Sequence, residues 1–132
     1  MANALYPKAK EGFLGGDIDM EVDNIVSILV DTASYTYNPS HVFLSEIPVG
    51  DRVATSNNLS SKSILNGVFN SDDILYLAVT GDISEALVLV QDSGDANTSR
   101  LVAYIDTATG LPVTPDGTNI HVTVDVNGWF SL

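Results

Sequence analysis

The sequence has no cysteine, only five Lys and Arg residues, and one tryptophan among its 132 residues. The lack of cysteine excludes a disulfide scaffold and a cysteine-ligated zinc site. No stretch approaches the ~18 consecutive apolar residues that a membrane-spanning helix needs. The first residues also lack the charged segment and following apolar run of a secretory signal, so we do not expect export by that route.

Negative charge dominates what is present. Seventeen acidic residues against five basic ones leave a formal net charge of −12 at pH 7. Nucleic-acid binders neutralise phosphates with clustered Lys and Arg, and five scattered cations cannot form that footprint. Anionic membranes are disfavoured for the same reason. We therefore expect no nucleic-acid and no membrane partner. The simplest interpretation is an acidic surface kept soluble by self-repulsion, and the alternative is a face that attracts a basic partner or divalent cations.

The chain is 45% hydrophobic and long enough to bury one core, which predicts a single domain over residues 1–132. Residues 1–16 are expected to hold a short helix, because Pro7 suits a first helical turn and Gly15-Gly16 can end it. Apolar side chains recur there at helical spacing, and they are Leu5, Ala9 and Phe13 with Leu14 beside them. This helix is too short to be stable alone and must dock on the rest of the domain.

From residue 24 onward the hydrophobic period becomes that of β-strands. The predicted strands cover residues 24–31, 52–55, 59–65, 67–70, 74–80, 85–91, 100–107, 119–125 and 129–132, with one helical turn at 40–46. The segments 75–79 and 87–90 are apolar at nearly every position, which predicts burial on both faces. Asp116-Gly117 and Asn127-Gly128 are typical two-residue turns, and the second predicts a hairpin that returns residues 129–132 to the preceding strand. The fold class predicted is mainly β: an antiparallel β-sandwich over residues 24–132 with a short N-terminal α-helix.

Residues 17–23 form the most suggestive polar pattern, because four acids alternate with apolar residues. On a strand this spacing would place four carboxylates in one row, facing solvent, a docking partner or a divalent cation. The match to a calcium-binding loop fails, since Val22 stands where the glycine belongs and Ile28 where the bidentate glutamate belongs. We therefore predict no metal site.

Catalytic motifs are missing from the sequence. It contains no nucleophile elbow, phosphate-binding glycine loop or dinucleotide fingerprint. His41 is interpreted as a surface or packing residue, and His121 would lie ~13 Å from Asp125 along one strand. The acidic pairs at 72–73 and 92/95 look like turns rather than the paired carboxylates of a glycosidase. We predict that the protein is not an enzyme and needs no cofactor.

Five segments carry a resemblance to a known family. They are MANALYPKAKE (1–11), ILVDTA (28–33), FLSEIP (43–48), EALV (85–88) and SRLVAYIDTATGLPV (99–113). Together they resemble a family of small virion structural proteins of tailed bacteriophages, and the similarity runs nearly end to end. The resemblance carries no catalytic motif.

The resemblance implies a place in the virion, either as a capsid cement (decoration) protein or as a component of the neck or tail. Small size, a β-rich domain, no coiled coil and an acidic surface favour cement. Such a protein, made in the host cytoplasm, would bind the major capsid protein on the capsid surface, commonly as a homotrimer. It would stabilise the assembled head shell because it binds only that state. A carbohydrate-binding β-sandwich is a further alternative.

Large apolar and aromatic side chains near the start of the chain are the candidate interface residues, because Tyr and Trp dominate binding hot spots. The candidates are Leu5, Tyr6 and Phe13 of the N-terminal helix, with Tyr35 and Tyr37 of the following connection. The alternative for all five is ordinary packing within the domain.

Overall fold

A computed structural model describes residues 3–132 and shows a mainly β chain with one α-helix near the start. Every strand pairing is antiparallel, which confirms the predicted fold class. The largest sheet has the order β1-β8-β7-β2-β3. Its strands are β1 (Ala4–Leu5), β2 (Ile25–Val30), β3 (Arg52–Thr55), β7 (Ala86–Gln91) and β8 (Arg100–Ile105).

The middle of this sheet is the core of the molecule. Every residue of β2 is buried, and Ala86–Val90 of β7 are completely inaccessible. Both faces of these strands are therefore covered, which is why they are rich in Val, Leu and Ile at consecutive positions. The prediction of two-sided burial is confirmed for residues 87–90. It is wrong for residues 75–79, where Leu75 and Leu77 are exposed.

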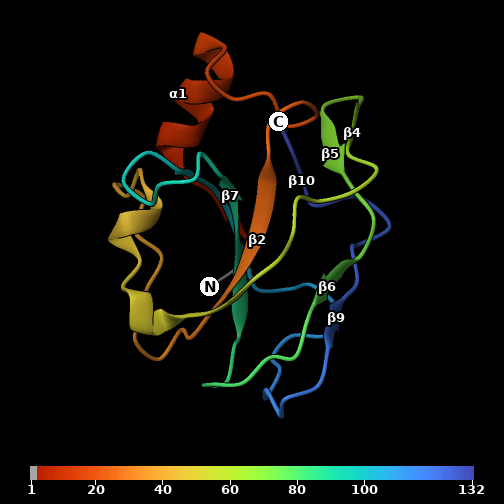
Figure 1. Cartoon of the computed structure of the whole chain (residues 1–132). Coiled ribbons are helices and arrows are strands. Elements are labelled where there is room, and N and C mark those ends of the chain that lie inside the picture. Colours follow the sequence, from red (N-terminus) through yellow and green to blue (C-terminus); the bar gives the residue numbers. More distant parts are fainter. Residues whose placement is uncertain (1–2) are drawn as a thin grey trace.

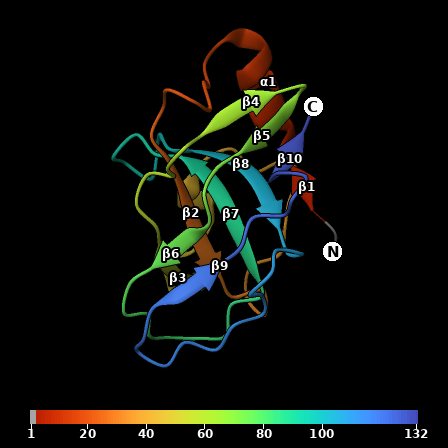
Figure 2. The same cartoon turned by 90° about the vertical axis from the view of Figure 1, so that its right-hand side faces the viewer.

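Two smaller sheets cover one face of the central sheet and give the fold its sandwich-like layering (Figure 1). One has the order β10-β5-β4 and the other pairs β6 with β9. Their strands are β4 (Ser63–Leu65), β5 (Val68–Asn70), β6 (Ile74–Tyr76), β9 (Ile120–Val122) and β10 (Phe130–Ser131). The 3₁₀ helices η1 (Leu44–Glu46) and η2 (Val49–Asp51) lie on the opposite side, and the β4–β5 hairpin lies at the same end of the molecule as α1 (Figure 1 and Figure 2).

Helix α1 spans Pro7–Gly15, with Pro7 in its first turn as predicted. Gly16 ends it in the left-handed conformation, at φ 80°, and its N–H bonds to carbonyls of the last turn. Leu5 precedes the helix and pairs with Ala103 in the sheet, so its inclusion in the helical stripe is wrong. Leu14 is 90% exposed and does not belong to the docked face either. Residues 1–2 of the predicted helical segment lie outside the described residues.

The predicted terminal hairpin is wrong. Strand β10 pairs with β5, and β9 pairs with β6. Gly128 has a positive φ but Asn127 does not, so this pair does not form the turn that joins adjacent strands directly. The two-residue turn with both residues at positive φ is Asn66-Gly67, which links β4 to β5.

Residues 17–23 form a turn instead of the expected strand with a row of carboxylates. The Asp19 carboxylate accepts the backbone N–H groups of Glu21 and Val22. The Asp23 carboxylate accepts the backbone N–H of Asp19 and a side-chain N–H of Gln91. Short acidic side chains that bond nearby backbone donors favour turns over strands. The acidic row therefore does not exist.

The predicted helical turn at 40–46 is shorter than expected and has a different cap. Only Leu44–Glu46 is helical, and the Ser40 side chain instead donates to Asn38. The backbone N–H groups of Val42 and Phe43 donate to the Glu46 carboxylate. These bonds lower the pKa of Glu46.

Gly12 lies on the buried face of α1, close to Ile18 and Arg100. A Cβ at this position would lie 2.7 Å from Ile18 Cδ1 and 3.2 Å from Arg100 Cζ. We expect Gly12→Ala to lower the free energy of unfolding by about 1 kcal/mol, because overpacking of about 1–3 kcal/mol outweighs a helix-propensity gain of up to about 1 kcal/mol. Urea unfolding measures the difference.

Gly15→Ala is the matched control, since a Cβ there meets nothing closer than 3.5 Å. It should leave stability unchanged or raise it. Equal effects of the two substitutions would show that the approach at Gly12 is not tight.

Candidate partner-binding surface

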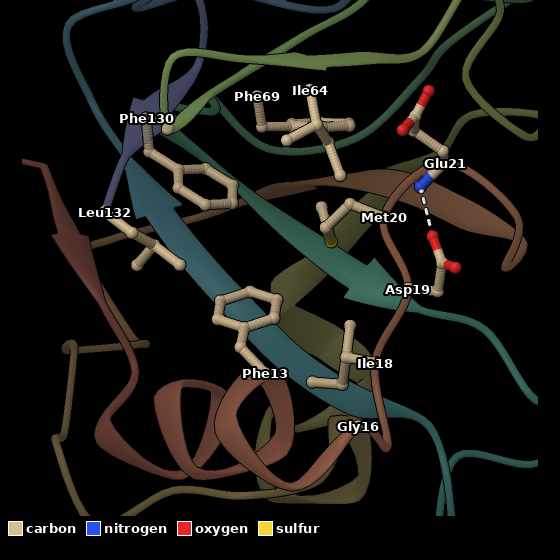
Figure 3. Close-up of a pocket in the computed structure, with 11 residues that line it drawn as sticks. Phe13, Gly16, Ile18, Asp19, Met20, Glu21, Ile64, Phe69, Phe130 and Leu132 are labelled. Carbon is tan, nitrogen blue, oxygen red and sulfur yellow. Dashed lines mark hydrogen bonds between the residues drawn. The ribbon is translucent and has the colours of Figure 1, made fainter.

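An apolar groove opens between α1, the turn at residues 17–23 and the β10-β5-β4 sheet (Figure 3). Its volume is about 430 Å³. Most of its lining is apolar, and the lining residues are Phe13, Gly16, Ile18, Asp19, Met20, Glu21, Ile64, Gly67, Phe69, Phe130 and Leu132. Side chains from four separate segments thus point toward one space, which we call the α1–β4 groove.

Strand register brings the aromatic residues of the groove together. Phe69 of β5 lies opposite Ile64 of β4 and opposite Phe130 of β10, so the three side chains share one face of the sheet. Phe130 lies between Phe69 and Phe13 of the helix, with ring centroids 5.6 and 6.1 Å away. The groove floor is therefore a row of three neighbouring phenylalanine rings.

The rim of the groove combines exposed apolar side chains with negative charge. Ile64 is 49% exposed and Leu132 is 70% exposed. Asp19 and Glu21 stand on the rim opposite them, joined by the hydrogen bond from the Glu21 N–H to the Asp19 carboxylate (Figure 3). No Lys or Arg lines the groove among the described residues. An apolar floor with an acidic edge suits an apolar segment flanked by basic residues.

Strand β4 also offers backbone groups to a partner. It is the outer strand of its sheet, and no described strand pairs with its far side. Leu65 and Val68 flank the two-residue turn and form a hydrogen-bonded pair. The alternation of pairs then directs the Ile64 N–H and C=O away from β5, toward the open edge. An extended chain could therefore bond to Ile64 while placing a side chain in the groove.

The tyrosines named from the sequence form a cluster on the other face of the central sheet. Tyr6 and Tyr35 are 0% and 3% exposed, and their hydroxyls are 2.7 Å apart. Burial is the main cause that raises the pKa of both phenols. For these two residues the structure supports the alternative of packing within the domain. Tyr37 is half-buried and donates its hydroxyl to the Leu5 carbonyl.

The candidate interface residues are thus dispersed, and Phe13 alone lines the α1–β4 groove. Sequence reasoning missed the residues from β4, β5 and β10, because it paired residues 129–132 with the wrong strand. One sequence signal could have indicated the β4–β5 hairpin. It is Asn66-Gly67, a typical two-residue turn between the apolar segments that build the groove wall.

The polar residues considered for chemistry also lie apart. His41 is near Tyr35, at 3.1 Å between Nδ1 and the hydroxyl, and His121 is exposed. Asp73 accepts the backbone N–H of Val124, and Asp92 accepts that of Gly94. Within residues 3–132, no group of three or more His, Cys, Asp or Glu side chains could hold a metal ion. No helix in that range has the length and apolar character to cross a membrane.

The chain matches no protein-family model and no curated protein sequence. The resemblance to phage structural proteins therefore stays a prediction.

Proposed function

We propose that this protein is a structural protein of a tailed-bacteriophage particle, a capsid cement protein that binds the assembled head shell through the α1–β4 groove. The observation that carries the proposal is the open groove itself, where the partly exposed Phe13 and Phe130 lie against the buried Phe69 beside a free strand edge. The extended sequence resemblance supplies the phage context. In this proposal the molecule acts by attachment and transforms no substrate.

The partner is an extended segment of the major capsid protein that carries a large apolar residue between basic ones. The segment adds along the edge of β4, bonds to the Ile64 backbone and inserts its apolar side chain over Phe69 and Phe130. Two features support this choice over a second copy of the chain as groove occupant. The rim acids favour basic flanks, and two copies would each bring a net charge of −12.

Attachment in this way would stabilise the shell mechanically. A ligand that binds only the assembled shell shifts the equilibrium toward it at every occupied site. Three copies joined around a three-fold position would bind with an avidity above that of one groove.

Density maps and heat resistance of the virion test the proposal. Particles should carry hundreds of copies on the head, and particles that lack the protein should release DNA at a lower temperature. Six or twelve copies at the neck or tail would instead show a ring component. Equal heat resistance with and without the protein would contradict a cement function.

Ile64→Thr tests the groove, because it shortens the exposed apolar side chain and keeps the β-branched shape. Ile83→Thr is the matched control, since Ile83 is 50% exposed and lies outside the groove. We expect Ile64→Thr to weaken binding to particles that lack the protein about fivefold per site, the equivalent of about 1 kcal/mol of lost apolar burial. Equal binding by both variants would exclude the groove as the attachment surface.

A further inference from the structure

A second hollow, on the opposite side of the central sheet, combines tyrosine rings with acidic side chains. Its volume is about 490 Å³, and its walls include Tyr37, Tyr104, Glu85 and Asp106. The Tyr37 and Tyr104 rings are 5.7 Å apart and inclined at 58°. No Lys or Arg lines it among the described residues. We call it the tyrosine–acid hollow.

Tyr104 is the feature that points to a ligand. Most of its ring is buried, and its hydroxyl makes no hydrogen bond to any described residue. Among the described residues, Arg100 Nε is the one buried side-chain polar atom that lacks a partner, so the Tyr104 oxygen keeps access to solvent through the hollow. The hydroxyl of the neighbouring Tyr37 is satisfied by the Leu5 carbonyl. The hollow therefore presents a hydroxyl that no described residue uses and that a ligand can reach.

The charges around Tyr104 are negative. Burial first, and then the charges of Asp106 and Glu85, raise the pKa of Tyr104, so the phenol stays protonated and neutral. Glu85 is partly buried and accepts the Thr32 N–H through one carboxylate oxygen, at 3.3 Å. Asp106 already interacts with another group, so Glu85 is the carboxylate that we expect to pair with a ligand.

We propose that the tyrosine–acid hollow binds the guanidinium group of an arginine side chain from a partner protein. A guanidinium stacks on aromatic rings and pairs with a carboxylate through its planar N–H groups. Its N–H groups can also donate to the Tyr104 oxygen. A lysine ammonium would gain the charge attraction but not the planar stacking, so it should bind more weakly. This inference does not depend on the phage assignment.

NMR titration of the purified chain with N-acetyl-arginine amide tests the proposal. We expect saturable shifts of the Tyr37, Tyr104 and Glu85 signals that weaken as salt is added. N-acetyl-citrulline amide, which has the same shape without the charge, should bind at least tenfold more weakly. Equal binding of the two probes, or no saturable shift with the arginine probe, would overturn the proposal. Saturation by a monosaccharide instead would identify a sugar site.

Two variants separate binding from folding. Glu85→Gln keeps an acceptor for the Thr32 N–H and removes the charge, so arginine binding should fall about tenfold. Glu21→Gln makes the same charge change in the α1–β4 groove. It should leave arginine binding at the tyrosine–acid hollow unaltered. Tyr104→Phe should weaken binding without lowering stability, because the hydroxyl has no partner to lose. Full binding by Glu85→Gln would contradict the assignment.

Discussion

Replacing Trp129 with alanine is expected to lower the free energy of unfolding by about 3–5 kcal/mol, the range for truncating a buried tryptophan. The side chain is 5% exposed, and its indole N–H donates to the Ser71 hydroxyl at 2.7 Å in a buried bond. The Trp129 backbone N–H also bonds to the Phe69 carbonyl. This residue therefore holds β10 against β5, and its loss should open the α1–β4 groove. Urea denaturation gives the change in stability.

Trp129→Phe is the control for this prediction. It keeps most of the apolar volume and removes the indole N–H, so it should cost about 1 kcal/mol from the lost hydrogen bond, in addition to a smaller packing loss. If Trp129→Ala were no more destabilising than Trp129→Phe, the indole ring would not be what holds β10 against β5.

The second large effect is expected at the hydrogen bond between the two layers. Ser27 of β2 and Tyr76 of β6 are 0% and 1% exposed, and their hydroxyls lie 2.5 Å apart. Tyr76→Phe leaves the Ser27 hydroxyl in the core without this partner, which should cost about 1–3 kcal/mol. Thermal and urea unfolding of the purified variant measure the cost.

A double-mutant cycle separates the bond from the packing. Ser27→Ala combined with Tyr76→Phe removes both polar groups, so the double variant should be more stable than the sum of the single effects predicts. Strictly additive effects would mean that the two hydroxyls do not depend on each other.

The sequence was most informative where periodicity reflects burial. The consecutive apolar residues of β7 and the Pro7 and Gly16 limits of α1 follow from local chemistry, and the structure confirms them. At residues 17–23 alternation was misleading, because Asp19 and Asp23 could satisfy backbone donors locally. A pattern of alternating polarity does not show whether carboxylates will face solvent or close a turn.

Strand pairing could not be predicted from the local sequence pattern. Asn127-Gly128 has the composition of a hairpin turn, but β9 ends at Val122 and the chain crosses to β5 instead. Trp129 is buried there, and its burial depends on a partner strand some sixty residues away in sequence. The groove escaped detection for the same reason, since its walls come from segments distant in the chain.

The packing of the N-terminal segment on β8 affects when the chain can fold during its synthesis. Ala4 lies beside Tyr104, and α1 packs on β8. The helix therefore emerges from the ribosome long before β8, the strand on which it packs, has been synthesised. Until then α1 is too short to persist alone, and its aromatic side chain, Phe13, meets solvent or other chains. Maturation must wait for the last third of the polypeptide, which favours slow, largely post-translational folding.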